Sequence, residues 1–176
     1  MLIMVGLAIV FGGIAAGAPL GEALRSATLA KQLATALTEQ KAEAIAAQDP
    51  TESDRFVAAL FFPNAQLLVV SARYASPPVL QARLAQKQYR DVYLDLQASA
   101  IPNSSVFFQD MNADGLCSEC DQTADLLYEG SATPTVFDGD WRKHNLSEKQ
   151  YEQQLAAADQ QYSRLLELLL ARLRGS

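Results

Sequence analysis

The chain has 176 residues, of which 49% are apolar and 19% are charged, and its net charge is −6 with a pI near 4.7. This length suits one domain with its own hydrophobic core, and the apolar fraction argues against an intrinsically disordered chain. A nucleic-acid-binding protein needs a basic surface to replace condensed counterions, so the acidic balance excludes nucleic acid as a partner.

The N-terminal segment has the composition of an export signal. No charged side chain precedes Glu22, and every residue from Met1 to Ala18 is apolar or glycine. This length suits a signal-peptide core and approaches the roughly 20 residues of a spanning helix. The missing basic residue ahead of the apolar run and the position of Pro19 are atypical of a cleaved signal. We predict that residues 1–20 are a signal peptide or a membrane anchor, which touches the membrane if it is not cleaved. The remaining chain would then lie in the periplasm or cell envelope.

Residues 22–48 have a helical composition, rich in Ala, Leu, Gln, Glu and Lys. Leu29, Leu33 and Leu37 recur every four residues, and Asp49-Pro50 ends the pattern. We expect a helical region over residues 21–49, either as a spacer or packed on the edge of a domain that spans residues 50–176.

Six segments of that domain have strand patterns. The first two are apolar on both faces and are joined by a short turn, as in a covered hairpin. A short helix opens at Pro78 and extends to about Gln88. The predicted strands are residues 56–62, 66–74, 91–97, 106–108, 125–128 and 135–137. The expected fold class is therefore α+β, with a mainly antiparallel sheet of five to six strands and a short crossover helix.

A long amphipathic helix closes the chain, from Glu148 to about Leu173. Ser147 and Gln150 have the spacing of a capping box, and Leu146 and Tyr151 occupy the hydrophobic-staple positions. The apolar stripe predicts a helix packed on the sheet. Additional leucines widen the stripe, which makes the C-terminal part of the helix a candidate contact for a protein partner or a membrane. These leucines are Leu166, Leu168, Leu170 and Leu173.

One acidic segment matches much of a calcium-binding loop. Side chains at loop positions 1, 3 and 5 converge on the ion, and glycine at position 6 permits the sharp turn. Gly115 occupies that position, and the aspartate at position 12 replaces the usual glutamate. The candidate calcium ligands are Asp110, Asn112, Asp114, the Leu116 carbonyl, Ser118 and Asp121. The alternative is an acidic surface turn, because Asp, Asn and Gly are ordinary turn residues.

The only two cysteines, Cys117 and Cys120, form a C-x-x-C pair inside this loop. An exported chain favours a structural disulfide between them. A redox dithiol is the alternative, but the neighbouring carboxylates oppose thiolate formation. A zinc site would need more Cys or His ligands than the chain supplies.

No complete catalytic site is evident. His144 is the only histidine, and no G-x-S-x-G nucleophile motif or glycine-rich phosphate loop accompanies it. We expect a solvated histidine ahead of the last helix. Asp138 and Asp140 are candidates for a metal site or a carboxylate pair, although turn chemistry also explains them.

The order of hairpin, short helix and strand over residues 56–96 resembles part of the FMN-binding split barrels related to pyridoxamine phosphate oxidases. This resemblance implies FMN as a cofactor but identifies no flavin-contacting residue. The segments 89–93, 109–115 and 136–141 are also similar to segments of uncharacterised exported bacterial proteins, which implies an envelope location.

The functional prediction is an exported or membrane-tethered envelope domain that acts as a binding or structural module and is stabilised by calcium. The alternatives are a flavin-binding split barrel and a thiol-redox protein that uses Cys117 and Cys120.

Overall fold

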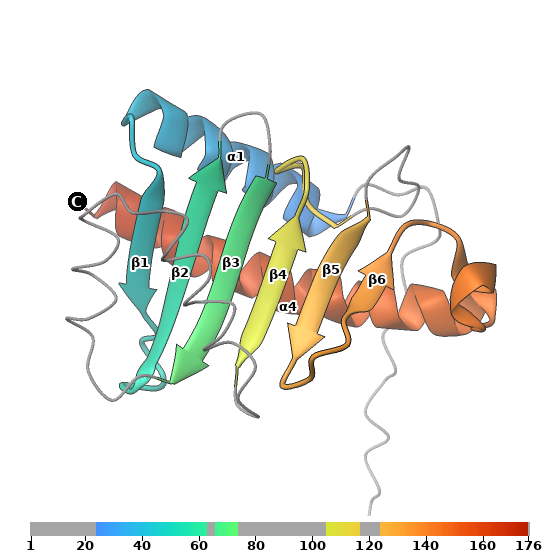
Figure 1. Cartoon of the computed structure of the whole chain (residues 1–176). Coiled ribbons are helices and arrows are strands. Elements are labelled where there is room, and N and C mark those ends of the chain that lie inside the picture. The colour runs from blue at the N-terminus through green and yellow to red at the C-terminus, as the bar shows by residue number, and fades with distance from the viewer. Residues whose placement is uncertain (1–23, 63–65, 74–104, 117–123, 176) are drawn as a thin grey trace, which may run out of the picture.

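The computed structural model describes residues 24–62, 66–73, 105–116 and 124–175. Its six strands form one antiparallel sheet in the order β1-β2-β3-β4-β5-β6 (Figure 1). The elements are α1 (Arg25–Glu39), β1 (Ala44–Gln48), β2 (Arg55–Phe62), β3 (Gln66–Arg73), β4 (Val106–Asp110), β5 (Asp125–Glu129), β6 (Thr135–Phe137), η1 (Trp141–His144) and α4 (Glu148–Arg174). The predicted α+β class, with a long C-terminal helix, is confirmed.

The central strands β2 and β3 are buried on both faces, as their continuous apolar sequences predict. Val57, Ala59 and Phe61 point toward the helices, and the intervening side chains form a second hydrophobic cluster on the opposite face. That second cluster contains Phe56, Ala58, Leu60, Leu68, Val70, Ala72 and Phe107.

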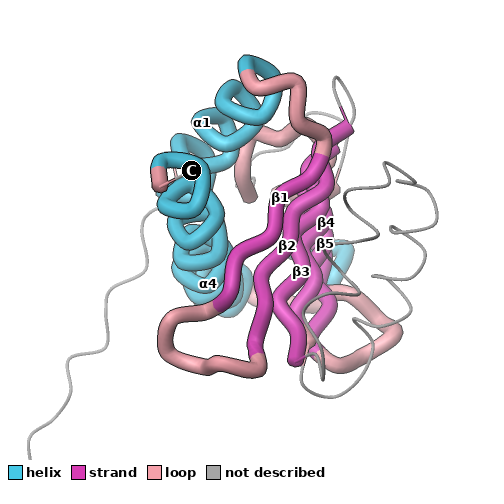
Figure 2. The backbone as a smooth tube through the Cα atoms, turned by 90° about the vertical axis from the view of Figure 1, so that its left-hand side faces the viewer, coloured by secondary structure: helices cyan, strands magenta, loops and turns pink. Residues whose placement is uncertain are grey.

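Both long helices lie on the same face of the sheet, where α4 crosses the strands beside α1 (Figure 2). The predicted capping box of α4 is present, because the Ser147 side chain accepts a hydrogen bond from the Gln150 backbone and the Gln150 side chain accepts one from the Ser147 backbone. The predicted stripe is buried from Tyr151 to Leu169. The additional Leu166 and Leu170 are also buried, and Leu168 and Leu173 pack against the core. Contact with a protein partner through this helix stays a prediction.

The prediction of a single helix through Gln48 is wrong beyond Glu39. Lys41 adopts φ +51°, and the N–H groups of Lys41 and Ala42 donate to the carbonyls of Thr38 and Leu37. These paired bonds are a Schellman motif, which ends a helix and reverses the chain. The following segment then pairs with β2 as β1. Ladder hydrogen bonds and burial outweigh the modest helical preference of alanine here.

The helical segment ahead of residue 50 is part of the domain rather than a detached spacer. Ala30, Leu33 and Leu37 of α1 are fully buried in the core cluster that also contains the apolar stripe of α4. Ala47 of β1 joins the same cluster. Of the two roles predicted for residues 21–49, packing against the domain is therefore the one observed for the part of that range that the structure describes.

Several predictions fall outside the described residues. These are the N-terminal segment through residue 23, the short helix over residues 78–88, the strand over residues 91–97, and the two cysteines. The resemblance to split barrels depends partly on the same stretch, so FMN binding stays a prediction. Within the described ranges, no helix is both long enough and apolar enough to span a membrane.

Candidate functional site: a polar groove beside the C-terminal helix

Toward one end of the sheet, the helix-facing side changes from apolar to polar. The strand register places Ser71 and Glu129 in one row across the sheet, on either side of Val106. The neighbouring row toward the centre is wholly apolar and buried: Ala59, Val69, Phe108 and Leu127. Ser71 and Glu129 line cavities at the edge of α4, whereas Val57, in the same row, is fully buried in the core.

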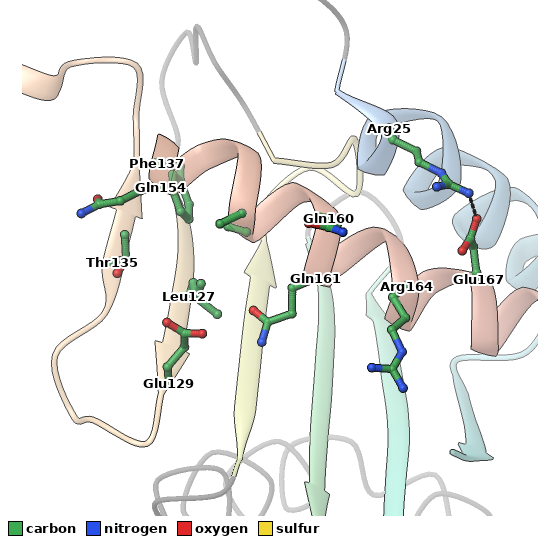
Figure 3. A pocket seen from close by; sticks show the side chains of 12 residues that line it. Arg25, Leu127, Glu129, Thr135, Phe137, Gln154, Gln160, Gln161, Arg164 and Glu167 are labelled. Atoms are coloured by element: carbon green, nitrogen blue, oxygen red, sulfur yellow. Dashed lines mark hydrogen bonds and ion pairs between the residues drawn. The ribbon is translucent and has the colours of Figure 1, made fainter. Parts of the chain in front are cut away.

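Two adjoining cavities occupy this edge, with volumes of about 720 Å³ and about 380 Å³. The larger lies between α4 and the β5–β6 hairpin (Figure 3). The smaller extends toward Asp49 and Arg55. Glu129, Gln161 and Arg164 line both cavities. We refer to the two cavities together as the α4 groove.

The wall that α4 contributes is polar because of helical spacing. Gln154, Gln161 and Arg164 are separated by seven and three residues, which keeps their side chains on one side of the helix. They flank the apolar stripe that packs on the sheet. Gln161 and Arg164 point from α4 toward the same end of the sheet, and Gln154 extends over β6 (Figure 3).

Arg164 is held in place by one of its nitrogens. Its Nη2 lies 3.1 Å from Oδ2 of Asp49 and 3.2 Å from Oγ1 of Thr51. The Asp49 side chain is only 2% exposed, whereas that of Arg164 is 59% exposed. Among the described residues, no contact engages Nε or Nη1 of Arg164. The guanidinium is therefore anchored through Nη2, while its Nε and Nη1 donors stay available.

The carboxylate that anchors Arg164 is itself ionised and well supported. Thr51 donates to Oδ1 of Asp49 through its backbone N–H at 2.8 Å and through its hydroxyl at 2.6 Å. Burial raises the pKa of Asp49, but these hydrogen bonds and the charge of Arg164 outweigh it, so the net pKa lies below its ordinary value. The ion pair with Arg164 is consequently maintained at neutral pH.

A second arginine lines the far end of the groove. The Arg55 side chain is 18% exposed, and its Nε lies 3.3 Å from Oε1 of Glu52. Its Nη1 approaches the hydroxyl of Ser71 at 3.4 Å. The contacts with Glu52 and Ser71 therefore fix the Arg55 side chain in the wall of the groove.

Two polar groups of the groove have no such partner. The Glu129 side chain is exposed and forms no hydrogen bond or ion pair within the described ranges. The side-chain amide of Gln161 likewise bonds to no described residue. These groups line the same two cavities as Arg164 (Figure 3). Unpaired donors and acceptors that converge on a cavity are the usual mark of a ligand site.

The sequence did not single out this groove. Its residues come from strands and a helix far apart in the chain, and each alone has the appearance of an ordinary solvated side chain. The only available signal was the polar border of the α4 stripe, which most surface helices share.

The acidic loop predicted to bind calcium lies elsewhere, at the opposite end of the sheet. Asp110 is fully buried, and its oxygens accept hydrogen bonds from the N–H groups of Asp114 at 3.1 Å and Gly115 at 2.9 Å. The hydroxyl of Tyr162 donates a third, at 3.0 Å. Burial raises the pKa of Asp110 to about 6, although these hydrogen bonds act in the opposite direction.

The same loop joins the two helices. The Leu116 N–H donates to the hydroxyl of Ser26 at 3.0 Å, and the Ser26 N–H donates to Oδ1 of Asp159 at 2.9 Å. Asp159 thus supplies from α4 the cap that α1 lacks in its own sequence. Gly115 has φ +86° and packs directly on the backbone of Ser26 and Ala27.

Four of the six predicted calcium ligands, Asp110, Asn112, Asp114 and Leu116, lie in the described part of this loop. Ser118, Asp121 and both cysteines lie outside it. Across the described residues, no group of three or more His, Cys, Asp or Glu side chains is arranged to hold a metal ion. Calcium binding and the Cys117–Cys120 disulfide stay predictions, and the observed role of Asp110 is to hold the loop together.

His144 has a partner that the sequence did not reveal. Its Nε2 lies 3.0 Å from Oδ1 of Asp138, which also accepts the N–H of Asp140 at 3.0 Å. Burial raises the pKa of Asp138, but these hydrogen bonds and the nearby positive charges leave it below its ordinary value. The pair closes the turn between β6 and α4. No nucleophile accompanies it among the described residues, so turn closure is the role that the geometry supports.

No protein-family model, curated protein or solved structure matches this chain.

Proposed function

We propose that this chain is a non-catalytic ligand-binding domain of the cell envelope, and that the α4 groove is its binding site. The observation that carries the proposal is the set of unpaired polar groups that line both cavities, namely Glu129, Gln161 and the Nε and Nη1 donors of Arg164. The apolar segment at residues 1–20 supports the envelope location.

The size and rigidity of the groove also suit a ligand. Cavities of about 300–1,000 Å³ typically hold small molecules. Its walls stand on α4 and on paired strands, and the Asp49–Thr51–Arg164 contacts hold the arginine in place before any ligand arrives. Such preorganisation lowers the entropic cost of binding.

The test is a melting-temperature screen of the purified domain against amino acids, short peptides, sugars and dicarboxylates. A ligand that binds only the native state raises the melting temperature by mass action. The Gln161→Trp variant places a large ring in the groove and should lose the response. Gln153→Trp is the matched control, because Gln153 is exposed on α4 and does not line the groove.

The proposal predicts that at least one compound stabilises the native protein and Gln153→Trp but has no effect on Gln161→Trp. A stabilising compound that acts equally on Gln161→Trp binds elsewhere, and that result would overturn the assignment of the groove. A screen without any response would count against a small-ligand function.

A further inference from the structure

We infer that the α4 groove takes a zwitterionic ligand, a free amino acid or a short peptide, with its carboxylate on Arg164 and its ammonium group on Glu129. The inference rests on the proposed function and names the ligand class for the same site. It follows from how the charges that line the groove are paired.

Most of the charged side chains that line the groove are already neutralised by one another. Arg25 forms an ion pair with Glu167, and Arg55 forms one with Glu52. Arg164 is paired with Asp49 through Nη2 alone. Within the described ranges, this leaves the carboxylate of Glu129 without a cation. The charged side chains that line the groove therefore sum to one net negative charge, located at Glu129, which favours a ligand with a cationic group and disfavours a polyanion.

The anionic end of a ligand fits Arg164. A guanidinium presents its N–H donors as a planar fork that matches a carboxylate, and charge-assisted bonds of this kind are about twice as strong as neutral ones. Asp49 and Thr51 occupy one nitrogen and fix the orientation of the plane. Both bidentate edges of a guanidinium include Nη2, so the remaining Nε and Nη1 donors offer a ligand carboxylate single charge-assisted hydrogen bonds.

The cationic end fits Glu129. Glu129 is the last residue of β5, and its side chain lies across the groove from α4 (Figure 3). No ion pair joins it to Arg164 or to any other residue that the structure describes. The two charges are thus held apart on opposite walls, an arrangement that a ligand with one charge of each sign can bridge.

Gln161 lies between these two groups and lines both cavities (Figure 3). Its amide offers both a donor and an acceptor, as required to bind the N–H and C=O groups of a peptide or an amide side chain. A ligand that carries an ammonium, an amide and a carboxylate in that order would satisfy all three groups together.

The test is calorimetric titration of the purified chain with the twenty L-amino acids, dialanine and trialanine. The tightest binder is then compared with its N-acetyl and C-amide forms. Each capped form should bind at least about tenfold more weakly, the loss expected for one charge-assisted hydrogen bond.

Two variants locate the ends of the ligand. Glu129→Gln should weaken binding of the free ligand to the level of the N-acetyl form and remove the difference between them. Arg164→Lys should do the same for the C-amide form, because lysine keeps the charge but lacks the Nε and Nη1 donors that remain after Nη2 binds Asp49 and Thr51. Glu148→Gln and Arg174→Lys are the matched controls on exposed parts of α4, and both should bind as the native chain does.

Capped and uncapped ligands of equal affinity would overturn the inference. Binding only of uncharged compounds, blocked by Gln161→Trp, would also overturn it and would leave the groove as a ligand site. If none of the zwitterionic probes binds and the wider screen is also silent, both the inference and the proposed function fail.

Discussion

The hydroxyl of Tyr162, on α4, donates a 3.0 Å hydrogen bond to Oδ2 of Asp110, the last residue of β4. Both side chains are fully buried, and the Tyr162 ring stacks on Phe108 with 4.6 Å between centroids. The same Asp110 oxygen accepts the N–H of Gly115. One carboxylate therefore links the sheet, the acidic loop and the C-terminal helix.

Removing that hydroxyl should destabilise the domain without disturbing its packing. Tyr162→Phe keeps the ring against Phe108 but deprives a buried carboxylate of one donor, which should lower the free energy of unfolding by about 2 kcal/mol. Urea denaturation measures the change. Tyr128→Phe, on a half-buried ring at the other face of the sheet, should change it by less than about 0.5 kcal/mol. Equal losses in the two variants would contradict the role assigned to this contact.

The ionisation of Asp110 should make stability depend on pH. Burial raises its pKa from 3.8 to about 6, so the folded state binds this proton more tightly than the unfolded state. The stabilisation is fully present below pH 3.8 and is lost as pH rises through about 6. Relative to Asp110→Asn, the native chain should lose about 2.4 kcal/mol between pH 4 and pH 7.

Urea unfolding of both proteins in the presence of a chelator, across that pH range, measures the difference. Subtracting the free energy of unfolding of Asp110→Asn from that of the native chain at each pH removes the contributions of groups that both proteins share, including groups whose effect on stability has the opposite pH dependence. Asp49 and Asp138 are such groups, because their lowered pKa values cost stability as the pH falls. Parallel pH profiles for the two proteins would show that Asp110 does not titrate in this window.

A methyl group at Gly115 should prevent the loop from docking on α1. A Cβ there would lie 2.3 Å from the backbone nitrogen of Ala27 and 2.5 Å from the carbonyl carbon of Ser26, at φ +86°. Overlap with backbone and left-handed strain together should cost about 3 kcal/mol or more. Gly175→Ala is the control, because its Cβ would meet nothing nearer than 3.6 Å. Thermal melting of the two variants decides the matter, and similar melting temperatures would be incompatible with the observed close approach.

Calcium should stabilise the fold if the acidic loop binds it. Millimolar calcium should raise the melting temperature, with about 2.7 kcal/mol gained at one hundred times the dissociation constant. Magnesium should do less, because it requires a tighter octahedral shell. Asp114→Ala with Asn112→Ala should remove the response while leaving Asp110 to hold the loop. A melting curve that is indifferent to calcium up to several millimolar would leave the loop as a structural turn.

The N-terminal segment should direct the domain out of the cytoplasm. Alkaline phosphatase fused to the C-terminus of the full chain should be active, because that enzyme folds only in an oxidising compartment. The same fusion without residues 1–20 should be inactive. Equal activity of the two fusions would refute the assignment of residues 1–20 as an export signal.

Local patterns in the sequence determined the elements that carry strong local signals. Continuous apolar runs identified β2 and β3, and the Ser147–Gln150 capping box with its 3.6-residue period identified α4. Each of these patterns lies within a few helical turns or a single hairpin, so residues close together in the sequence are enough to specify the element. The same locality explains the error at β1, where alanine-rich residues become a strand only because β2 lies beside them.

Only the tertiary structure decided what the polar residues do. The sequence placed Asp110 in a candidate ion-binding loop, whereas packing buries it and supplies Tyr162 from the last helix as a donor. It offered no reason to associate Glu129 with Arg164, which face one groove because the sheet register and the rotation of α4 bring them there. A polar side chain acquires its role from the groups that desolvate it and hydrogen-bond to it, and those groups come from distant parts of the chain.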